Sequence, residues 1–179
     1  GIVEDKGVVG DYDDDLKAVV TGTRDKVAEK MADLRVADAI TEIFNLFRRC
    51  NRYIDETMPW VLAKDEASKD RLATVLYNLV EGITIGASLL SPYMPETSEK
   101  IFAQLNTSMV EFDNLATFGN YQSGTKVTEK PQILFARLDE KEVMEKAKVL
   151  MEKQAASVKA ANAAIEEDTV IDIEPKDEI

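Results

Sequence analysis

The chain has 179 residues, of which 45% are hydrophobic and 31% charged, and its formal net charge is −12. Its size fits one domain with a tail, and its composition is that of an ordinary globular protein. The absence of histidine excludes catalytic triads and His-ligated zinc, and the single cysteine, Cys50, excludes an internal disulfide. We find no run of about 18 apolar residues and no basic-then-apolar leader, so we expect a cytoplasmic protein without a membrane partner.

The acidic charge is unevenly distributed along the chain. Residues 165–179 hold seven acids and one base, which is half of the net charge, whereas residues 33–64 hold five acids and five bases. A negative charge opposes the binding of nucleic acid. This objection therefore applies to the end of the chain and not to its middle.

Apolar residues at spacings of three and four predict four helices in the first 105 residues. These helices cover residues 13–32, 34–56, 69–91 and 95–105. Pro59 cannot continue the second helix. Asp13, Asp14 and Asp15 are expected to form a solvated start of the first helix, where acids oppose the helix dipole, and Gly22 is a weak point within it.

The remainder of the chain changes character after residue 105. The predicted parts are a helical bundle at 1–105 that opens with a loop at 1–12, a loop-rich segment at 106–138 that packs on the bundle, a C-terminal helix at 139–165 and an acidic, solvated tail at 166–179. Within the loop-rich segment, residues 133–135 are expected to form a short extended piece. The fold class is therefore all-α, an antiparallel helical bundle with a loop-rich segment and a C-terminal helix.

The end of the second helix holds the residues most suited to RNA. Arg48, Arg49 and Arg52 lie within five residues, and Trp60 follows the rigid Pro59. Arginines contact phosphates, and an exposed ring stacks on bases. The same residues also have a structural interpretation, in which the arginines favour the helix dipole and Trp60 closes the end of the bundle.

Three runs of sequence then point to a family. They are Asn51–Lys64 (NRYIDETMPWVLAK), Leu89–Ser98 (LLSPYMPETS) and Leu134–Asp139 (LFARLD). The first run resembles the signature of the anticodon-binding domain of methionyl-tRNA synthetase. The second is similar to the next helix junction of that domain, and the third to the short element just after its bundle. The resemblance covers about residues 1–150, and its first run is the most specific.

The resemblance implies the helical bundle of class I synthetases and recognition of the CAU anticodon of tRNA(Met). Trp60 would stack on the first anticodon base, Pro59 would shape the pocket, and Asn51 and Asp55 would orient it. The predicted tRNA site consists of Trp60, Pro59, Asn51, Asp55, Arg52 and Arg48. On the residue pattern alone, Asn51 is instead expected to bond the backbone of the following turn.

The catalytic motifs of the family are not found in this chain. There is no histidine for a His-Ile-Gly-His motif and no Lys-Met-Ser-Lys-Ser loop. The resemblance therefore implies a non-catalytic piece of methionine–tRNA ligase with no cofactor or metal of its own. Its expected partners are the anticodon loop and the catalytic domain of the same polypeptide, which would bind ATP and methionine. The companion asparagine and arginine of the family would lie on a helix before residue 1, and residues 168–179 resemble a linker to a C-terminal appendix, so we expect feeble RNA binding by this chain alone.

Two other functions stay open on the residues alone. One is a helical protein–protein interaction module that uses an apolar groove and binds no RNA, and the other is an enzyme that uses two carboxylates in a cleft. An exposed Trp60 beside Arg48, Arg52 or Lys64 would favour RNA. A buried Trp60 with a bare apolar groove elsewhere would favour the interaction module.

Overall fold

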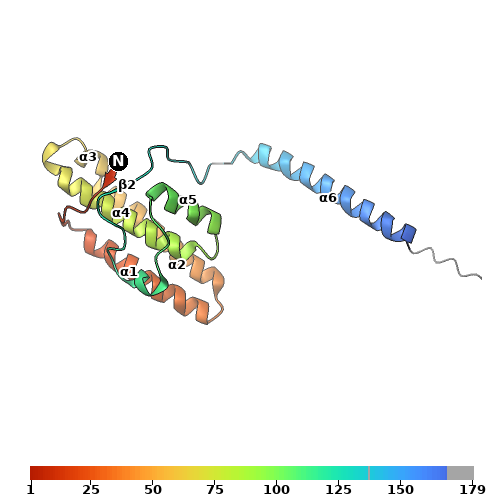
Figure 1. The fold of residues 1–179 in the computed structure, drawn as a ribbon, viewed down its shortest axis with the longest axis horizontal. Helices are drawn as coiled ribbons and strands as arrows, with labels where there is room; N and C mark the ends of the chain where they lie inside the picture. The colour runs from red at the N-terminus through yellow and green to blue at the C-terminus, as the bar shows by residue number, and fades with distance from the viewer. Residues whose placement is uncertain (137, 169–179) are drawn as a thin grey trace, which may run out of the picture. The chain divides into compact units, whose positions relative to one another are not determined.

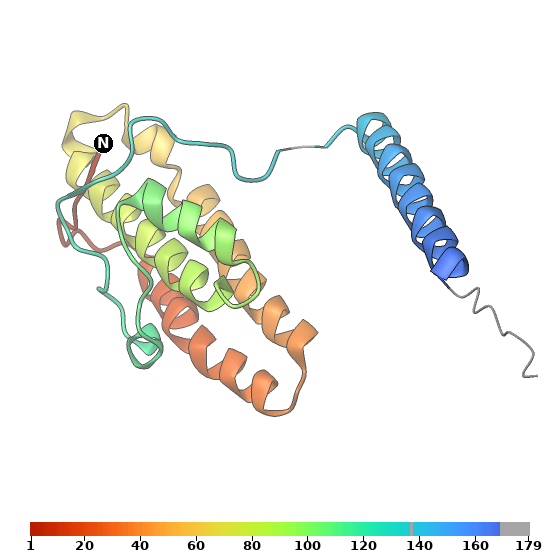
Figure 2. The ribbon, with the colours of Figure 1, turned by 45° about the vertical axis from the view of Figure 1, so that its right-hand side comes forward.

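The computed structural model describes residues 1–136 and 138–168. Three long helices, α1 (Asp13–Ala32), α2 (Val36–Thr57) and α4 (Lys69–Leu90), contact one another and lie side by side in Figures 1 and 2. The shorter α5 (Pro95–Leu105) packs against α4. This arrangement confirms the all-α prediction, and the ends of these four helices lie within two residues of the predicted ones.

The core lies between the three long helices. Its fully buried side chains include Leu16 of α1, Ile43 and Leu46 of α2, and Val75 and Ile85 of α4. The stretch Glu66–Leu90 is long and apolar enough to cross a membrane, judged by its most apolar window of 18 residues. However, 78% of that window is buried inside the fold, as expected for the central helix of a bundle.

Two connections between elements differ from the prediction. The N-terminal segment is not only a loop, because β1 (Ile2–Val3) pairs antiparallel with β2 (Thr125–Lys126). Residues 133–135 form neither a strand nor a helix, and 134–135 lie in a bend, so the expected extended piece is wrong. The pairing partner of β1 is more than 120 residues away in the chain, which local sequence patterns do not reveal.

A buried carboxylate fixes the loop-rich segment on the bundle. Glu81 of α4 is fully buried, and its two oxygens accept the backbone N–H groups of Gly119 (2.9 Å), Asn120 (2.8 Å) and Tyr121 (2.6 Å). The same segment contains a short 3₁₀ helix, η2 (Phe112–Ala116), which contacts α1. Hydrogen bonds to a buried carboxylate are strong, so Glu81 fixes the irregular segment together with the buried side chains of Leu115 and Tyr121.

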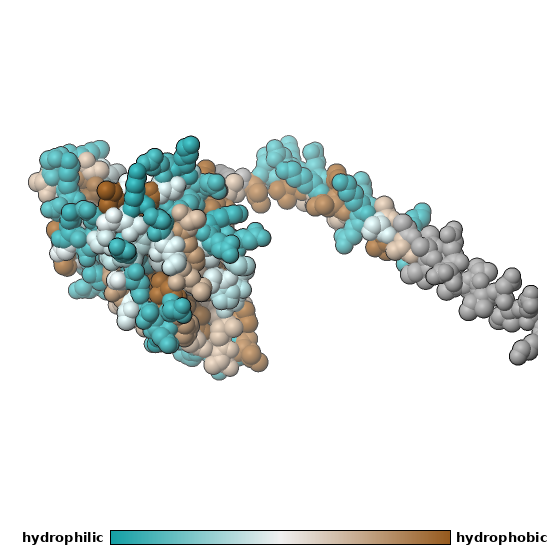
Figure 3. Space-filling view, in the orientation of Figure 1, coloured by the Kyte–Doolittle hydropathy of each residue, from teal (hydrophilic) through white to brown (hydrophobic). Residues whose placement is uncertain are grey.

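The chain divides into two compact units, residues 1–134 and 135–179. The second unit contains α6 (Glu140–Asp168), which includes the Ala-rich stretch 155–164 and extends three residues beyond the predicted helix end. Exposed apolar side chains line one edge of α6, as Figure 3 shows in brown. The predicted tail after residue 168 and Arg137 of the third sequence run lie outside the described residues.

Candidate functional site

Pro59 creates the surface on which Trp60 is displayed. The residue before a proline avoids the helical conformation, and Met58 adopts a left-handed one with φ of 45° while its N–H donates to Ile54 O at 2.9 Å. Pro59 then opens the four-residue helix α3 (Pro59–Leu62). Leu62 packs against the core, whereas the Trp60 side chain is 52% exposed. The interpretation of Trp60 as a plug for the bundle is therefore wrong.

Four predicted site residues share one face of α2. Arg48, Asn51, Arg52 and Asp55 are all exposed, and their spacing places them on one surface, which we call the α2 stripe. The stripe lies opposite the buried face of α2 and leads toward the turn that carries Pro59 and Trp60. Among the described residues the side chain of Asn51 makes no hydrogen bond, so its expected bond to the backbone of the following turn is wrong.

The three arginines near the end of α2 have different environments. Arg48 is exposed and donates to the side chain of Asn45, on the same helix. The side chain of Arg52 is 77% exposed and donates through Nε to Glu56 Oε1 at 2.8 Å. Arg49 points inward and has a side chain only 9% exposed. Two of the three arginines are therefore accessible to a ligand, and the third is part of the structure.

Arg49 links α2 to the start of α1. Its Nε donates to Asp15 at 2.6 Å, its Nη2 donates to the backbone oxygen of Tyr12 at 3.3 Å, and its Nη1 lies 3.0 Å from Glu56 Oε2. Asp15 is thus an ion-pair partner rather than a merely solvated helix-start acid. This connection fixes the part of α2 that carries the stripe relative to α1.

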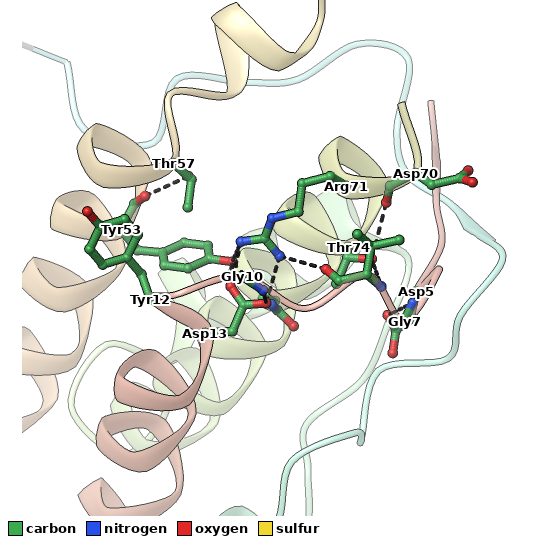
Figure 4. Close-up of polar contacts among 12 residues, drawn as sticks. Asp5, Gly7, Gly10, Tyr12, Asp13, Tyr53, Thr57, Asp70, Arg71 and Thr74 are labelled. Atoms are coloured by element: carbon green, nitrogen blue, oxygen red, sulfur yellow. Dashed lines mark hydrogen bonds and ion pairs between the residues drawn. The ribbon is translucent and has the colours of Figure 1, made fainter. Parts of the chain in front are cut away.

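A second polar cluster fixes the same end of α2 to α4 (Figure 4). The Tyr53 hydroxyl donates to Asp13 at 2.6 Å, and Arg71 of α4 donates to both oxygens of Asp13 at 2.6 and 2.7 Å. Asn78 of α4 donates to the Tyr53 hydroxyl at 3.1 Å. Asp13 is fully buried, so the expectation that it belongs to a solvated helix start is wrong. The ion pair between Asp13 and Arg71 could not be predicted from local sequence patterns, because the two residues are 58 positions apart in the chain.

Burial and hydrogen bonding shift the pKa values in this cluster in opposite directions. Burial alone would raise the pKa of Asp13, but hydrogen bonds from Arg71, Tyr53 and the Gly10 N–H together lower it below its ordinary value. Burial, and then the bond to Asp13, raise the pKa of Tyr53 to about 12. The cluster therefore holds a charged Asp13–Arg71 pair and a neutral tyrosine at physiological pH.

Comparison with known proteins shows the family of this chain. A family model described as the anticodon binding domain of methionyl tRNA ligase matches residues 3–155. The chain belongs to this family. Methionine–tRNA ligase of Clostridium tetani is 45% identical to it over 140 residues, which are 78% of this chain and 22% of that protein. The enzyme of Clostridium acetobutylicum is 38% identical over 167 residues, 93% of this chain and 26% of that protein.

Solved structures of the methionyl-tRNA synthetase family agree with the fold. The apo form of the Mycobacterium tuberculosis enzyme superposes with a TM-score of 0.70 at 29% identity, over 78% of this chain and 28% of that protein. The family match extends from α1 into the middle of α6 and therefore includes the α2 stripe, Pro59 and Trp60. The resemblance found in the sequence is confirmed. The chain spans about a quarter of the length of the relatives it matches.

Proposed function

We propose that this chain binds the anticodon loop of tRNA(Met) and distinguishes its CAU anticodon, as the anticodon-binding part of a methionine–tRNA ligase. The observation that carries the proposal is the exposure of Trp60 on α3, at the end of an exposed polar stripe on α2. A ring of this kind offers a flat apolar face to an unstacked base. Family membership provides independent support.

The proposed roles follow from the chemistry of each side chain. Trp60 stacks on the first anticodon base, and such a contact contributes about 1–3 kcal/mol. Arg48 and Arg52 contact phosphates, while Asn51 and Asp55 offer hydrogen-bond groups that can reject wrong bases. A single stacked base gives only weak binding, so we expect the chain alone to bind RNA weakly and with strong salt dependence.

We assign the chemical steps to other parts of the ligase. The chain has no histidine and no Lys-Met-Ser-Lys-Ser loop. ATP and methionine would accordingly bind in a catalytic domain of the same polypeptide, and this chain would contribute recognition of the tRNA. The segment 33–64, in which acids and bases balance, would face the RNA rather than the acidic C-terminal end.

One feature supports a protein-binding role as the alternative. An apolar pocket of about 430 Å³ lies between α1, the end of α4 and residues 109–115. Its lining includes Val27, Met31, Leu89, Tyr93, Met109 and Phe112. However, an interaction module of this kind gives no reason for an exposed Trp60 directly after the helix that bears the polar stripe. The RNA proposal therefore accounts for more of the surface.

The experiment compares two aromatic residues with the same exposure. Trp60 and Phe112 are each 52% exposed, but Phe112 lies on η2. Binding of a fluorescently labelled CAU anticodon stem-loop would be measured by anisotropy at low salt. We expect Trp60→Leu to weaken binding by about fivefold or more, which corresponds to the loss of about 1 kcal/mol or more of stacking, and Phe112→Leu to have no effect. Equal effects of the two substitutions would contradict the proposal.

A further inference from the structure

Glu56 lies between an exposed arginine and a buried one. Its Oε1 accepts from Arg52 Nε at 2.8 Å, and its Oε2 lies 3.0 Å from Arg49 Nη1. The Glu56 side chain is 16% exposed, against 77% for Arg52 and 9% for Arg49. One carboxylate therefore connects a surface guanidinium to the interior of the bundle.

The contact between Glu56 and Arg49 holds the carboxylate in place. Arg49 Nη1 and Glu56 Oε2 are both buried, and within the described chain neither makes a hydrogen bond, so they are held by this ion pair alone. Separating them would leave these two buried atoms, Arg49 Nη1 and Glu56 Oε2, without a charged partner in a medium of low dielectric, which is unfavourable. Arg49 is itself bound to Asp15 and to the Tyr12 backbone, so Glu56 is fixed relative to two helices.

We propose that Glu56 is a positioning residue for RNA binding, which fixes the guanidinium of Arg52 so that it can contact a phosphate. This inference rests on the proposed function and names a further residue of the same site. The bond to Glu56 uses only Nε of Arg52, so the four N–H bonds on its Nη groups stay available to phosphate oxygens.

The benefit of such positioning is entropic. An exposed arginine has many rotamers, and immobilising it on binding costs conformational entropy. A guanidinium already fixed by a buried carboxylate loses less freedom when the RNA arrives. Simple electrostatics predicts the opposite role for Glu56, because an acid beside a phosphate site repels the RNA.

These two accounts differ in the sign of one measurement. Glu56→Gln removes a negative charge, so electrostatics alone predicts tighter binding of the CAU stem-loop. Positioning predicts weaker binding, by about three- to tenfold. The matched control is Asp38→Asn, which removes the same charge from the Arg35–Asp38 pair (2.7 Å) at the other end of α2, about 20 Å along the helix from Arg52. The control should leave binding unchanged or slightly tighter.

A double-mutant cycle separates positioning from a general loss of structure. In an Arg52→Ala background, Glu56→Gln should no longer weaken binding, because the group that it positions is gone. Circular dichroism would check that each variant is folded. If Glu56→Gln alone unfolds the chain, the pair Arg49→Met with Glu56→Gln removes the buried charge as well and allows the same comparison.

Each outcome has a separate meaning. Weakening by Glu56→Gln that disappears in the Arg52→Ala background supports the inference. Unchanged or tighter binding by Glu56→Gln, or equal weakening in both backgrounds, overturns it while wild-type binding upholds the proposed function. Failure of the wild-type chain to bind the stem-loop at low salt removes the proposed function and the inference with it.

Discussion

At the scale of single residues, the site depends on charges that the fold has buried. Asp13 is fully buried but accepts hydrogen bonds from Arg71, Tyr53 and the Gly10 backbone. Such a group stabilises the fold only while it stays ionised and paired. Because Tyr53 belongs to α2 and Arg71 to α4, the cluster also fixes the helix that bears the α2 stripe.

Replacing Asp13 tests this cluster. We expect Asp13→Asn to lower the free energy of unfolding at neutral pH by about 3 kcal/mol, because Arg71 loses its charged partner. The lowered pKa of Asp13 means that its contribution is present above the unfolded pKa of about 3.9 and is lost as the pH falls through the lower, folded pKa. Denaturant unfolding at several pH values should therefore show the difference between wild type and variant shrinking below about pH 4. A difference that stayed constant to the lowest pH would contradict this account.

At the scale of elements, the bundle depends on close contact between α2 and α4. A methyl group on Gly86 of α4 would lie 2.7 Å from Cε1 of Phe47 and 3.2 Å from Cδ2 of Leu46, so the two helices approach closely there. Gly22 of α1, by contrast, has nothing within 4 Å of the position that a methyl group would take. The two glycines therefore have different reasons to be present.

The same substitution at these two positions should have opposite effects. Gly86→Ala should lower the free energy of unfolding by about 1–3 kcal/mol through overpacking. Gly22→Ala should raise it by about 1 kcal/mol, because alanine favours a helix interior and meets no neighbour there. Denaturant unfolding of both variants measures the pair. Destabilisation of equal size at both sites would show that the packing at Gly86 is not specific.

The sequence allowed the long helices to be predicted because their apolar residues repeat at helical spacing. It did not reveal α3, since four residues carry no periodic signal, although Pro59 correctly marked the break. The pairing of β1 with β2 and the contacts of Glu81 also escaped prediction, because each joins distant segments through backbone groups. The exposure of Trp60 could not be predicted from the sequence. It depends on how α3 is oriented, with Leu62 packed against the core and Trp60 left exposed.

At the scale of the whole molecule, the chain separates into the unit of residues 1–134, which holds the core, and the unit that contains α6. The apolar side chains described along α6, such as Leu150 and Met151, are largely exposed. The first unit has its own buried core and its own polar clusters. We therefore expect it to fold without the second.

Truncation tests this independence. A chain that ends at Leu134 should unfold at a temperature within about 4 °C of that of the full chain, since a larger change would require about 1 kcal/mol or more of lost stability. Thermal unfolding followed by circular dichroism measures the difference. A much lower midpoint for the truncated chain would mean that residues 135–179 stabilise the bundle.

The most direct test of the central claim uses Trp60, which is the only tryptophan in the chain. Its fluorescence would be followed while the protein is titrated at low salt with a CAU anticodon stem-loop, and then with a stem-loop whose first anticodon base is changed. Recognition of tRNA(Met) through Trp60 predicts quenching by the first RNA and little or none by the second. Equal quenching by both RNAs, or none by either, would contradict it.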